Sequence, residues 1–333
     1  MLKIGVVGCG YWGPNLIRNL IETNRATVVV HDQDKSRMEK VKKRFPSVGL
    51  ADDYSELLKT DVDGIIVATP VTGHYPLGKQ ALEQGKHVML EKPMTSSVAH
   101  AEDLIRLAQS KNLVLMVGHT FVYSPAVRKV KELLDSGALG KLLFVTASRV
   151  NLGIHQKDVS VIWDLAPHDF SVLLNWLGEK PLRVSAVGRD YVQKGILDVA
   201  FINIEFASGA IGHVEVAWLA PSKLRRTVIV GSKKMLVYDD TQAVEKVKIY
   251  DNGVTIKDPE TFGEYQLSYR TGDIMSPRID TYEPLSAEMS HFLDCIENGT
   301  TPHSDGVHGL EVVKLLEAAE QSVKLGGLSV ELV

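Results

Sequence analysis

Apolar segments alternate with amphipathic segments over the first 120 residues or so of the chain. The segment 62–68 is apolar without alternation, as is typical of a strand that is buried on both faces. Helical patterns at 74–84 and 97–110 lie between the later apolar segments. We expect the strands at 2–7, 26–30, 62–68, 87–90 and 113–117. Strands that alternate with helices predict a doubly wound parallel sheet of the Rossmann type.

The pattern changes after Tyr123, where longer segments alternate apolar and polar residues. We expect alternating strands at 141–150, 182–192, 199–207, 210–219, 225–230 and 235–239, and amphipathic helices at 125–135, 164–177 and 311–325. The turns Ser208-Gly209 and Gly231-Ser232 indicate hairpins. The sequence therefore predicts an α+β region with a large, mainly antiparallel open sheet that helices cover on one face.

The other face of this sheet must meet solvent or another subunit. Apolar positions such as Val214, Val216 and Trp218 make a homodimer or homotetramer through this sheet plausible. Residues 252–280 have the least pattern and are interpreted as a loop or a subunit arm. We expect two domains, a dinucleotide-binding domain over 1–120 and a substrate-binding and oligomerisation domain over 121–333.

Composition restricts the class of protein. Hydrophobic residues make up 44% and charged residues 23% of 333 residues, which is typical of a soluble globular protein. The net charge of −4 gives no reason to expect nucleic acid or an acidic membrane as partner. No apolar run approaches the ~20 residues that span a bilayer. With a strand beginning at residue 2, we expect no signal peptide. Cys9 and Cys295 lack metal-ligand spacing, so we expect unpaired thiols, a cytoplasmic location and no metal.

A glycine-rich turn follows the first strand. Gly8, Gly10 and Gly13 fit the pattern G-x-G-x-x-G, and Pro14 opens the helix that follows. Gly8 allows a tight turn, Gly10 lets a pyrophosphate approach the backbone, and Gly13 lets the helix pack closely on the strand. The helix N-terminus then offers unpaired N–H groups to the phosphates. The turn predicts dinucleotide binding, with Tyr11 and Trp12 packing in the cofactor loop.

Asp32 favours NAD as the dinucleotide. It ends the second strand nineteen residues after Gly13, close to the spacing of a carboxylate that binds the adenine ribose. A carboxylate accepts hydrogen bonds from the ribose hydroxyls of NAD and repels the 2′-phosphate of NADP. Arg37, five residues on, could offset that repulsion, and Asp32 could also simply end a strand.

Three residues are candidates for catalysis. Lys92 follows a strand of the parallel sheet, at the edge where ligands bind, although Glu-Lys-Pro alone is more often a turn. Pro167 predicts that a helix begins just before it, with Asp164 as its N-cap. Asp164 and His168 then project on similar faces. An imidazole beside a carboxylate can take the proton of an alcohol as hydride leaves its carbon, but a capping aspartate and a core histidine remain an alternative.

Weaker candidates surround these residues. The run from Lys223 through Arg225 to Arg226 could hold an anionic group, although a charge run is more often a solvated turn. Near a strand end, polar residues suited to sugar contacts are Arg149, Asn151 and His155. His119 and Tyr123 are expected at the domain junction, where a nicotinamide would lie.

Taken together, these motifs resemble the Gfo/Idh/MocA family. The ordered set is GCGYWG, Ala68-Thr69-Pro70 with His74, Glu91-Lys92-Pro93 and then D-x-x-x-H before an antiparallel sheet. The resemblance implies that Lys92, Asp164 and His168 form the catalytic centre. It also implies cofactor contacts from the residues of these motifs, namely Thr69, Pro70, His74, Glu91 and Lys92, with His119.

The last motif departs from the common form G-G-x-x-x-D-x-G-x-H. Val161-Ile162-Trp163 and Leu165-Ala166-Pro167 occupy the places of its glycines. The form R-x-N-L-G…W-D-L-A-P-H-D is similar to the branch found with nucleotide-sugar biosynthesis. The resemblance therefore implies hydride transfer between NAD and a secondary hydroxyl, that at C3, of UDP-N-acetylglucosamine or its uronate. The expected substrate contacts are Lys92, Tyr123, Arg149, Asn151, Asp164, His168, Lys223 and Arg225.

Two other functions remain open. The chain could be a dehydrogenase or ketoreductase of a free sugar or cyclitol, or a non-catalytic NAD(H)-binding sensor. The joint presence of Lys92, Asp164 and His168 argues against the sensor.

Overall fold

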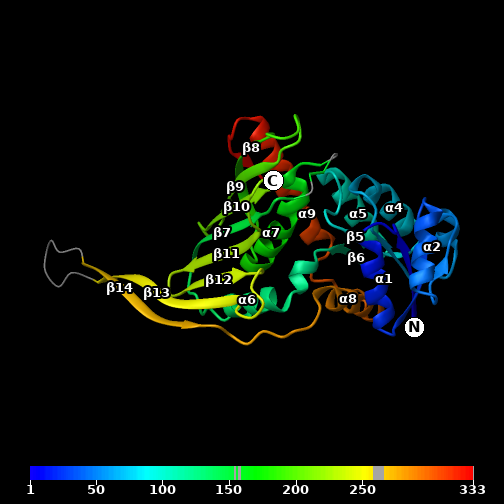
Figure 1. The fold of residues 1–333 in the computed structure, drawn as a ribbon, viewed down its shortest axis with the longest axis horizontal. Coiled ribbons are helices and arrows are strands. Elements are labelled where there is room, and N and C mark those ends of the chain that lie inside the picture. The colour runs from blue at the N-terminus through cyan, green and yellow to red at the C-terminus, as the bar shows by residue number, and fades with distance from the viewer. Residues whose placement is uncertain (154, 157–158, 258–265, 333) are drawn as a thin grey trace. The chain divides into compact units, whose positions relative to one another are not determined.

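The chain forms two compact units. The computed structural model describes residues 1–153, 155–156, 159–257 and 266–332 (Figure 1). The first unit comprises Met1–Ser124 and Tyr282–Glu317, and the second comprises Pro125–Thr281 and Ala318–Val333. Packing therefore divides the chain differently from a single cut after residue 120, because residues 282–317 return to the first unit.

The first unit contains a six-stranded sheet in the order β3-β2-β1-β4-β5-β6, with every neighbouring pair parallel. The strands are β1 (Leu2–Val7), β2 (Ala26–His31), β3 (Gly49–Leu50), β4 (Gly64–Val67), β5 (His87–Glu91) and β6 (Leu115–Gly118). The predicted doubly wound sheet is confirmed. The strand order reverses between β1 and β4, so that the carboxyl ends of these strands border the crevice where ligands bind in such folds.

Helices connect the strands of this unit. They are α1 (Gly13–Glu22), α2 (Lys35–Arg44), α3 (Tyr54–Lys59), α4 (Val71–Glu83), α5 (Val98–Ser110) and the 3₁₀ helix η1 (Thr120–Tyr123). The returning segment adds α8 (Pro284–Asn298) and the first part of α9 (Gly306–Lys324), whose residues from Ala318 onward belong to the second unit. The apolar pattern did not reveal α2, which buries only Met38 and Val41. The Asp34 side chain caps that helix by accepting from the Ser36 N–H.

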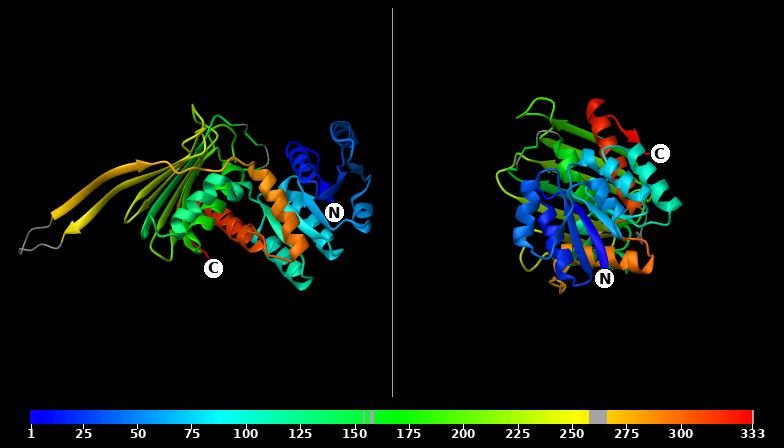
Figure 2. Two further views of the ribbon diagram at one scale, coloured as in Figure 1. Left: turned by 90° about the horizontal axis from the view of Figure 1, so that it is seen from below. Right: turned by 90° about the vertical axis from the view of Figure 1, so that its right-hand side faces the viewer.

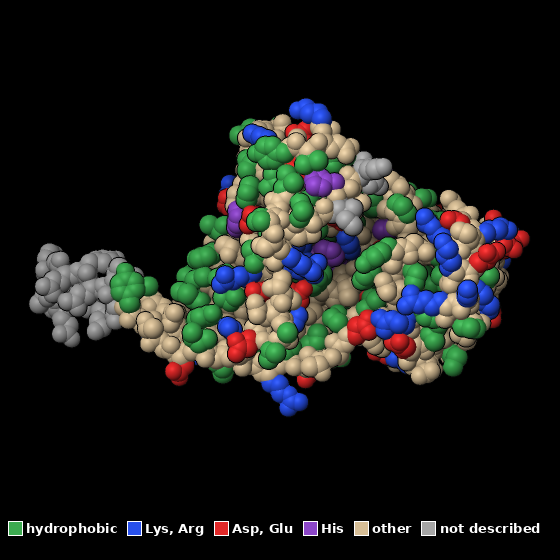
Figure 3. All heavy atoms as spheres, viewed as in Figure 1, with side chains coloured by type: hydrophobic (Ala, Val, Ile, Leu, Met, Phe, Trp, Pro, Cys, Tyr) green, Lys and Arg blue, Asp and Glu red, His purple; other side chains and the backbone are tan. Residues whose placement is uncertain are grey.

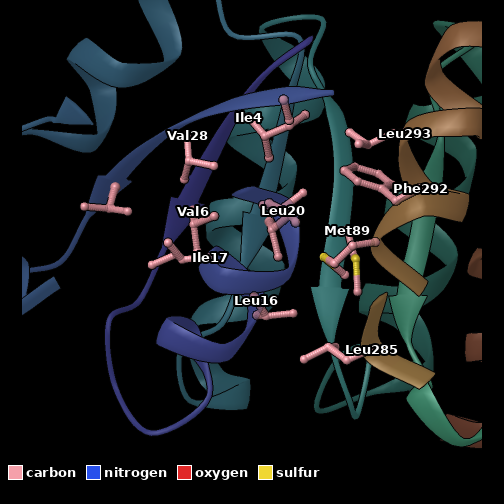
Figure 4. Packing of buried hydrophobic residues seen from close by; sticks show 14 of the residues in the cluster. Ile4, Val6, Leu16, Ile17, Leu20, Val28, Met89, Leu285, Phe292 and Leu293 are labelled. Carbon is pink, nitrogen blue, oxygen red and sulfur yellow. The ribbon is translucent and has the colours of Figure 1, made fainter. Parts of the chain in front are cut away.

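Helix α8 completes the core of the first unit. Leu285, Met289 and Phe292 lie at helical spacing on one face of α8 and are buried in one cluster with residues of α1 and β1. Figure 4 shows the side chains of Leu285, Phe292 and Leu293 on the side of the sheet where Met89 lies. This packing explains why residues 282–317 belong to the first unit.

The second unit contains a nine-stranded sheet in the order β14-β13-β12-β11-β7-β10-β9-β8-β15. The strands are β7 (Leu142–Val150), β8 (Pro181–Arg189), β9 (Val199–Phe206), β10 (Ile211–Ala217), β11 (Leu224–Gly231), β12 (Met235–Asp239), β13 (Val247–Lys257), β14 (Gln266–Met275) and β15 (Val330–Glu331). Among these described strands, β10 and β7 run parallel and the other neighbouring pairs run antiparallel. The mainly antiparallel sheet and both hairpins are confirmed.

Part of the unpatterned stretch at 252–280 is strand. β13 and β14 pair along most of their length, and Figures 1 and 2 show the pair extending beyond the other strands of the sheet. Residues 258–265 of that stretch lie outside the described residues.

Helices α6 (Pro125–Asp135) and α7 (Val161–Leu177) cover one face of this sheet. Val214, Val216 and Trp218 are 0%, 0% and 1% exposed, which corrects their expected place on the uncovered face. They lie under α7, because β10 alternates and buries Val214 and Val216 on the helix side. Exposed apolar side chains instead include those of Phe201 and Ile211.

Charged side chains of both signs are interspersed over the surface of the first unit that Figure 3 shows. None of the helices in the described part of the chain is long and apolar enough to span a membrane.

Candidate active site

The glycine-rich turn at the end of β1 requires two of its glycines for steric reasons. Gly8 has φ +103°, and a Cβ there would lie 2.4 Å from the Ala68 carbonyl oxygen. A Cβ at Gly13 would lie 2.1 Å from the Gly8 carbonyl oxygen. Any larger residue at either position would therefore force the turn away from β4 or α1 away from β1.

The same turn leaves space for a ligand. The nearest heavy atom to a Cβ at Gly10 would be the Arg37 Nη1, 3.8 Å away. Helix α1 has no side-chain hydrogen bond at its N-cap, Trp12, and no acidic residue in its first turn. Its first N–H groups and the positive end of its dipole therefore suit a diphosphate, so that the turn fits a dinucleotide.

Asp32 lies at the end of β2, beside this turn. Its Oδ2 accepts from the Cys9 N–H at 2.6 Å and its Oδ1 from the Asp34 N–H at 2.8 Å. These bonds fix the carboxylate at the rim of the turn, and each oxygen retains a lone pair for a ribose hydroxyl. Arg37 is exposed and pairs with Asp34 at 3.4 Å, while Tyr11 is 92% exposed.

An Asp32→Ala variant is expected to bind NADH about tenfold more weakly and to lose its preference over NADPH, because the ribose loses its acceptor and the 2′-phosphate loses a repulsive charge. Dissociation constants for NADH and NADPH measure both effects. Asp52→Ala is the control, since Asp52 is an exposed carboxylate that pairs with Lys35. Equal affinity of the unmodified protein for NADH and NADPH would remove the role of Asp32.

His74 joins two turns of the parallel sheet edge. It is 1% exposed, with Nδ1 2.9 Å from the Pro93 carbonyl oxygen and Nε2 2.8 Å from the Thr69 carbonyl oxygen. Burial lowers the pKa of His74, so that the ring is neutral and donates to one of these carbonyls. His74 thus links the Thr69-Pro70 turn to the turn that contains Lys92. In this position it supports two turns for which cofactor contacts are predicted.

His119 follows β6 in the same unit. It is 1% exposed, and neither ring nitrogen has a hydrogen-bond partner among the described residues. Burial holds its pKa well below the usual range, and the charges of His308 and Lys92 add to this effect. A neutral buried imidazole with unused nitrogens is able to bond a polar ligand group, as the prediction for His119 requires.

Asp164 and His168 lie on α7, which begins at Val161 after the N-cap Ser160. The expectation that this helix starts just before Pro167, with Asp164 as N-cap, is wrong. Pro167 lies inside the helix, and the Asp164 N–H already donates to the Ser160 carbonyl at 3.1 Å. Burial of eleven helix residues offsets the one backbone bond that proline removes. The spacing of four residues still places Asp164 and His168 on one face.

Trp218 holds Asp164 in place. Its indole Nε1 donates to the Asp164 Oδ2 at 3.0 Å, and the ring packs at 5.2 Å from that of His155. Sequence reasoning did not include Trp218 in the site. The available signal was the indole N–H itself, because a buried tryptophan usually needs an acceptor.

Two expected substrate contacts have other partners in the structure. Arg149 is 6% exposed and donates through Nε and Nη2 to both carboxylate oxygens of Asp169, at 2.6 and 3.1 Å. This ion pair joins β7 to α7. Tyr123 is 2% exposed, and its hydroxyl lies 3.0 Å from the Ser304 Oγ. Arg149 and Tyr123 are both buried, and the polar group of each already has a hydrogen-bond partner. These contacts favour a structural role for each residue over the expected contact with substrate.

The remaining candidates lie at strand ends of the second unit. Lys223 is exposed just before β11, and Arg225 pairs with Asp240 at 3.5 Å. The Asn151 N–H donates to the Ala217 carbonyl at the end of β10. Lys92 belongs to the first unit, and Asp164 and His168 to the second, so that their joint catalytic assignment remains a prediction.

Two family models match this chain. A model described as an oxidoreductase family with an NAD-binding Rossmann fold matches residues 2–119, and the C-terminal domain model of the same family matches residues 127–237. The chain belongs to the Gfo/Idh/MocA family. It is therefore an NAD-dependent oxidoreductase, and the predicted cofactor and resemblance are confirmed.

Similar proteins include enzymes with different substrates. The chain is 28% identical to UDP-N-acetylglucosamine 3-dehydrogenase of Acidithiobacillus ferrooxidans, over 94% of each chain. It is 24% identical to scyllo-inositol 2-dehydrogenase (NAD(+)) of Bacillus subtilis, over 90% of this chain and 88% of the relative. The solved structure of GenD2 from gentamicin A biosynthesis, in complex with NAD, is 25% identical with a TM-score of 0.83, covering 100% of this chain and 96% of the other.

Proposed function

We propose that this enzyme transfers hydride between NAD and the C3 hydroxyl of a nucleotide-linked sugar, such as UDP-N-acetylglucosamine or its uronate. The observation that supports this substrate is the similarity to a UDP-N-acetylglucosamine 3-dehydrogenase over 94% of each chain. The motif that contains Asp164 and His168 lies within that matched length.

The proposed acid–base group is His168. It removes the proton of the sugar hydroxyl during oxidation and returns it during reduction. The glycine-rich turn and Asp32 would hold NAD, which would supply the acceptor for the hydride of the carbon that bears this hydroxyl. Lys92 donates a hydrogen bond to the hydroxyl oxygen and stabilises the negative charge that develops there.

Asp164 orients this pair. Its carboxylate lies one helical turn before His168, and the Trp218 indole fixes one of its oxygens. A fixed carboxylate on the same helix face stabilises the imidazolium that forms when His168 accepts a proton. Trp218 is therefore a positioning residue, since it acts through Asp164.

The nucleotide part of the substrate requires cationic or polar contacts. Lys223 and Arg225 lie at the start of β11, and Arg225 is in register with Arg149 of β7. The Lys223 side chain is exposed and suits a diphosphate. We propose Lys223 and Arg225 as the contacts for this anionic group.

A free cyclitol or sugar is the second candidate substrate. The similarity to scyllo-inositol 2-dehydrogenase over 90% of this chain favours it. The chemistry at Lys92, Asp164 and His168 would be the same, because a secondary hydroxyl is oxidised in both cases.

The two candidates are separated by measuring NADH absorbance with enzyme stoichiometric to NAD, since an unfavourable oxidation would be hidden in a catalytic assay. UDP-N-acetylglucosamine, its uronate, free glucose and myo-inositol are added in turn. We expect NADH with a UDP-sugar and none with the free polyols. Lys223→Ala is expected to raise KM for the UDP-sugar with little change in kcat, as loss of a uniform binding contact does. NADH formed only with a free polyol would contradict the proposed substrate.

We also propose that the enzyme assembles as a homodimer or homotetramer through the open sheet. Exposed apolar residues on its strands include Phe201, Ile211, Val187 and Leu143, and Figure 3 shows hydrophobic side chains at the surface of this unit. A molar mass of one chain in sedimentation equilibrium would contradict this assembly.

A further inference from the structure

Glu91, beside Lys92, has a buried carboxyl group. Glu91 ends β5 directly opposite Gly118 in β6. A Cβ at Gly118 would lie 3.1 Å from the carboxyl carbon and Oε1 of Glu91, so that the glycine leaves the space that this carboxyl occupies. The Lys92 backbone N–H donates to the Glu91 Oε2 at 3.3 Å, while Oε1 is buried without a hydrogen-bond partner among the described residues.

A second buried carboxyl group, that of Glu288 on α8, lies within electrostatic range of Glu91. Glu288 is 0% exposed, and its Oε2 accepts from the Thr120 Oγ1 at 2.8 Å. Its Oε1 is buried and accepts no hydrogen bond from the described residues. Burial raises the pKa of Glu288 well above its usual range, and the like charge of Glu91 raises it further. Glu288 therefore stays protonated when Glu91 ionises.

Glu91 itself titrates near neutrality. Burial raises its pKa to about 7, against the lowering effects of the Lys92 charge, the Lys92 backbone bond and the nearby Trp12 indole. The Trp12 Nε1 acts on this carboxyl without reaching hydrogen-bond geometry. The two carboxyl groups together are thus neutral below about pH 7 and have a single negative charge above it.

Other ionisable groups interact with Lys92 and Glu288. Among the described residues, His119 after β6 interacts electrostatically with Lys92 and with His308 of α9, and Tyr123 of η1 interacts with Glu288. Burial keeps the His119 pKa well below its usual range and the Tyr123 pKa above its own, so that both stay neutral between about pH 6 and 8. The His308 ring contacts the His119 ring edge-on, with ring centroids 5.5 Å apart. The effect of His308 on the pH dependence is therefore tested separately, with a variant of its own.

The position of Glu91 in the sheet relates it to the nicotinamide. The glycine-rich turn and Asp32 belong to the half of the sheet formed by β1, β2 and β3, where the adenosine binds. The second half, β4 to β6, then faces the nicotinamide nucleotide, and Glu91 lies at its carboxyl edge. The nicotinamide ring is positively charged when oxidised and uncharged when reduced. A carboxyl that changes charge here discriminates between the two forms.

We propose that the Glu91 carboxyl, buried beside Lys92 at the carboxyl end of β5, sets the relative affinity of this enzyme for oxidised and reduced NAD. The neutral carboxyl favours NADH, and the carboxylate favours the cationic ring of oxidised NAD. Release of NADH after sugar oxidation is then promoted as the pH rises. This proposal rests on NAD binding and does not depend on which sugar is the substrate.

The test measures dissociation constants for oxidised NAD and NADH between pH 5.5 and 8.5 by calorimetry with the whole 333-residue chain. The ratio of the two constants is expected to move about tenfold in favour of oxidised NAD as pH rises through about 7. Glu91→Gln should make the ratio of the two dissociation constants independent of pH. Glu91→Met, which introduces an apolar neutral side chain, should give the same result. Glu288→Gln, which imitates a protonated acid, should keep the wild-type ratio within about twofold.

Two control variants isolate the effect. Glu297→Gln removes an exposed carboxyl of α8 that pairs with Arg25, and His308→Gln removes the second histidine. Both should keep the pH dependence. A constant ratio in the wild type, a pH-dependent ratio in Glu91→Gln, or a large change in Glu288→Gln would overturn the proposal. None of these outcomes bears on the substrate, because no sugar is present.

Discussion

A Lys92→Ala, His168→Ala double variant is expected to lose at least about 10³-fold in kcat, because the reaction then lacks both its proton acceptor and the cation that stabilises the developing alkoxide. Each single variant should lose about 10²-fold or more. The two losses should not multiply, since both groups act on the same oxygen. The measurement is single-turnover formation of NADH with the sugar that gives NADH in the substrate comparison.

A matched double variant controls for general effects of these substitutions. Lys86 precedes β5 and donates to the Thr60 carbonyl, and His213 of β10 pairs with Asn203. Lys86→Ala, His213→Ala should keep kcat within about twofold, as is usual for surface changes. The catalytic double variant should still bind NADH. Turnover at the wild-type rate in that variant would end the assignment of Lys92 and His168.

Replacing Arg149 by methionine is expected to destabilise the protein by about 3–5 kcal/mol, because Asp169 would keep a buried charge without its guanidinium. The pair is almost fully buried, with side chains 7% and 8% exposed. The free energy of unfolding from urea titration is the measurement. The double variant Arg149→Met, Asp169→Leu should recover most of the loss, since it removes both charges from the interior.

The exposed pair Arg183–Glu205 is the control on the same sheet. It links β8 and β9 at 3.1 Å, with side chains 44% and 54% exposed. Arg183→Met should cost at most about 1 kcal/mol, because solvent screens such pairs. If Arg149→Met also lowered the free energy of unfolding by only about 1 kcal/mol, Arg149 would not be a structural cation. The prediction that Arg149 contacts the substrate would then be favoured again.

Much of the first unit could be predicted because its signals are local. The glycine turn, the helix after it and Asp32 lie within 32 residues, and each follows from backbone sterics or from the helix N-terminus. The structure shows why glycine is needed at two positions of this turn: a Cβ at Gly8 or Gly13 would overlap backbone oxygens. The hairpin turns of the second unit were predicted for a similar reason.

Long-range packing explains the errors. The start of α7 was placed too late because a rule for isolated helices was applied to Pro167, whereas burial stabilises the observed helix. Val214 and Val216 alternate as expected, but alternation alone does not say which face a helix covers. The strands β13 and β14 have little pattern of their own and are stabilised by pairing.

The sequence by itself determined most of the alternating strands and helices of the first unit, the dinucleotide turn, the NAD cofactor and the presence of Lys92, Asp164 and His168, because local sterics and residue chemistry suffice for these. Only the tertiary structure decided that α8 joins the first unit, that Trp218 fixes Asp164 and that the charge of Glu91 acts on Glu288. These pairs are 54 to 197 residues apart in the chain. A contact of that kind depends on burial and on the dielectric around it, which no single residue specifies.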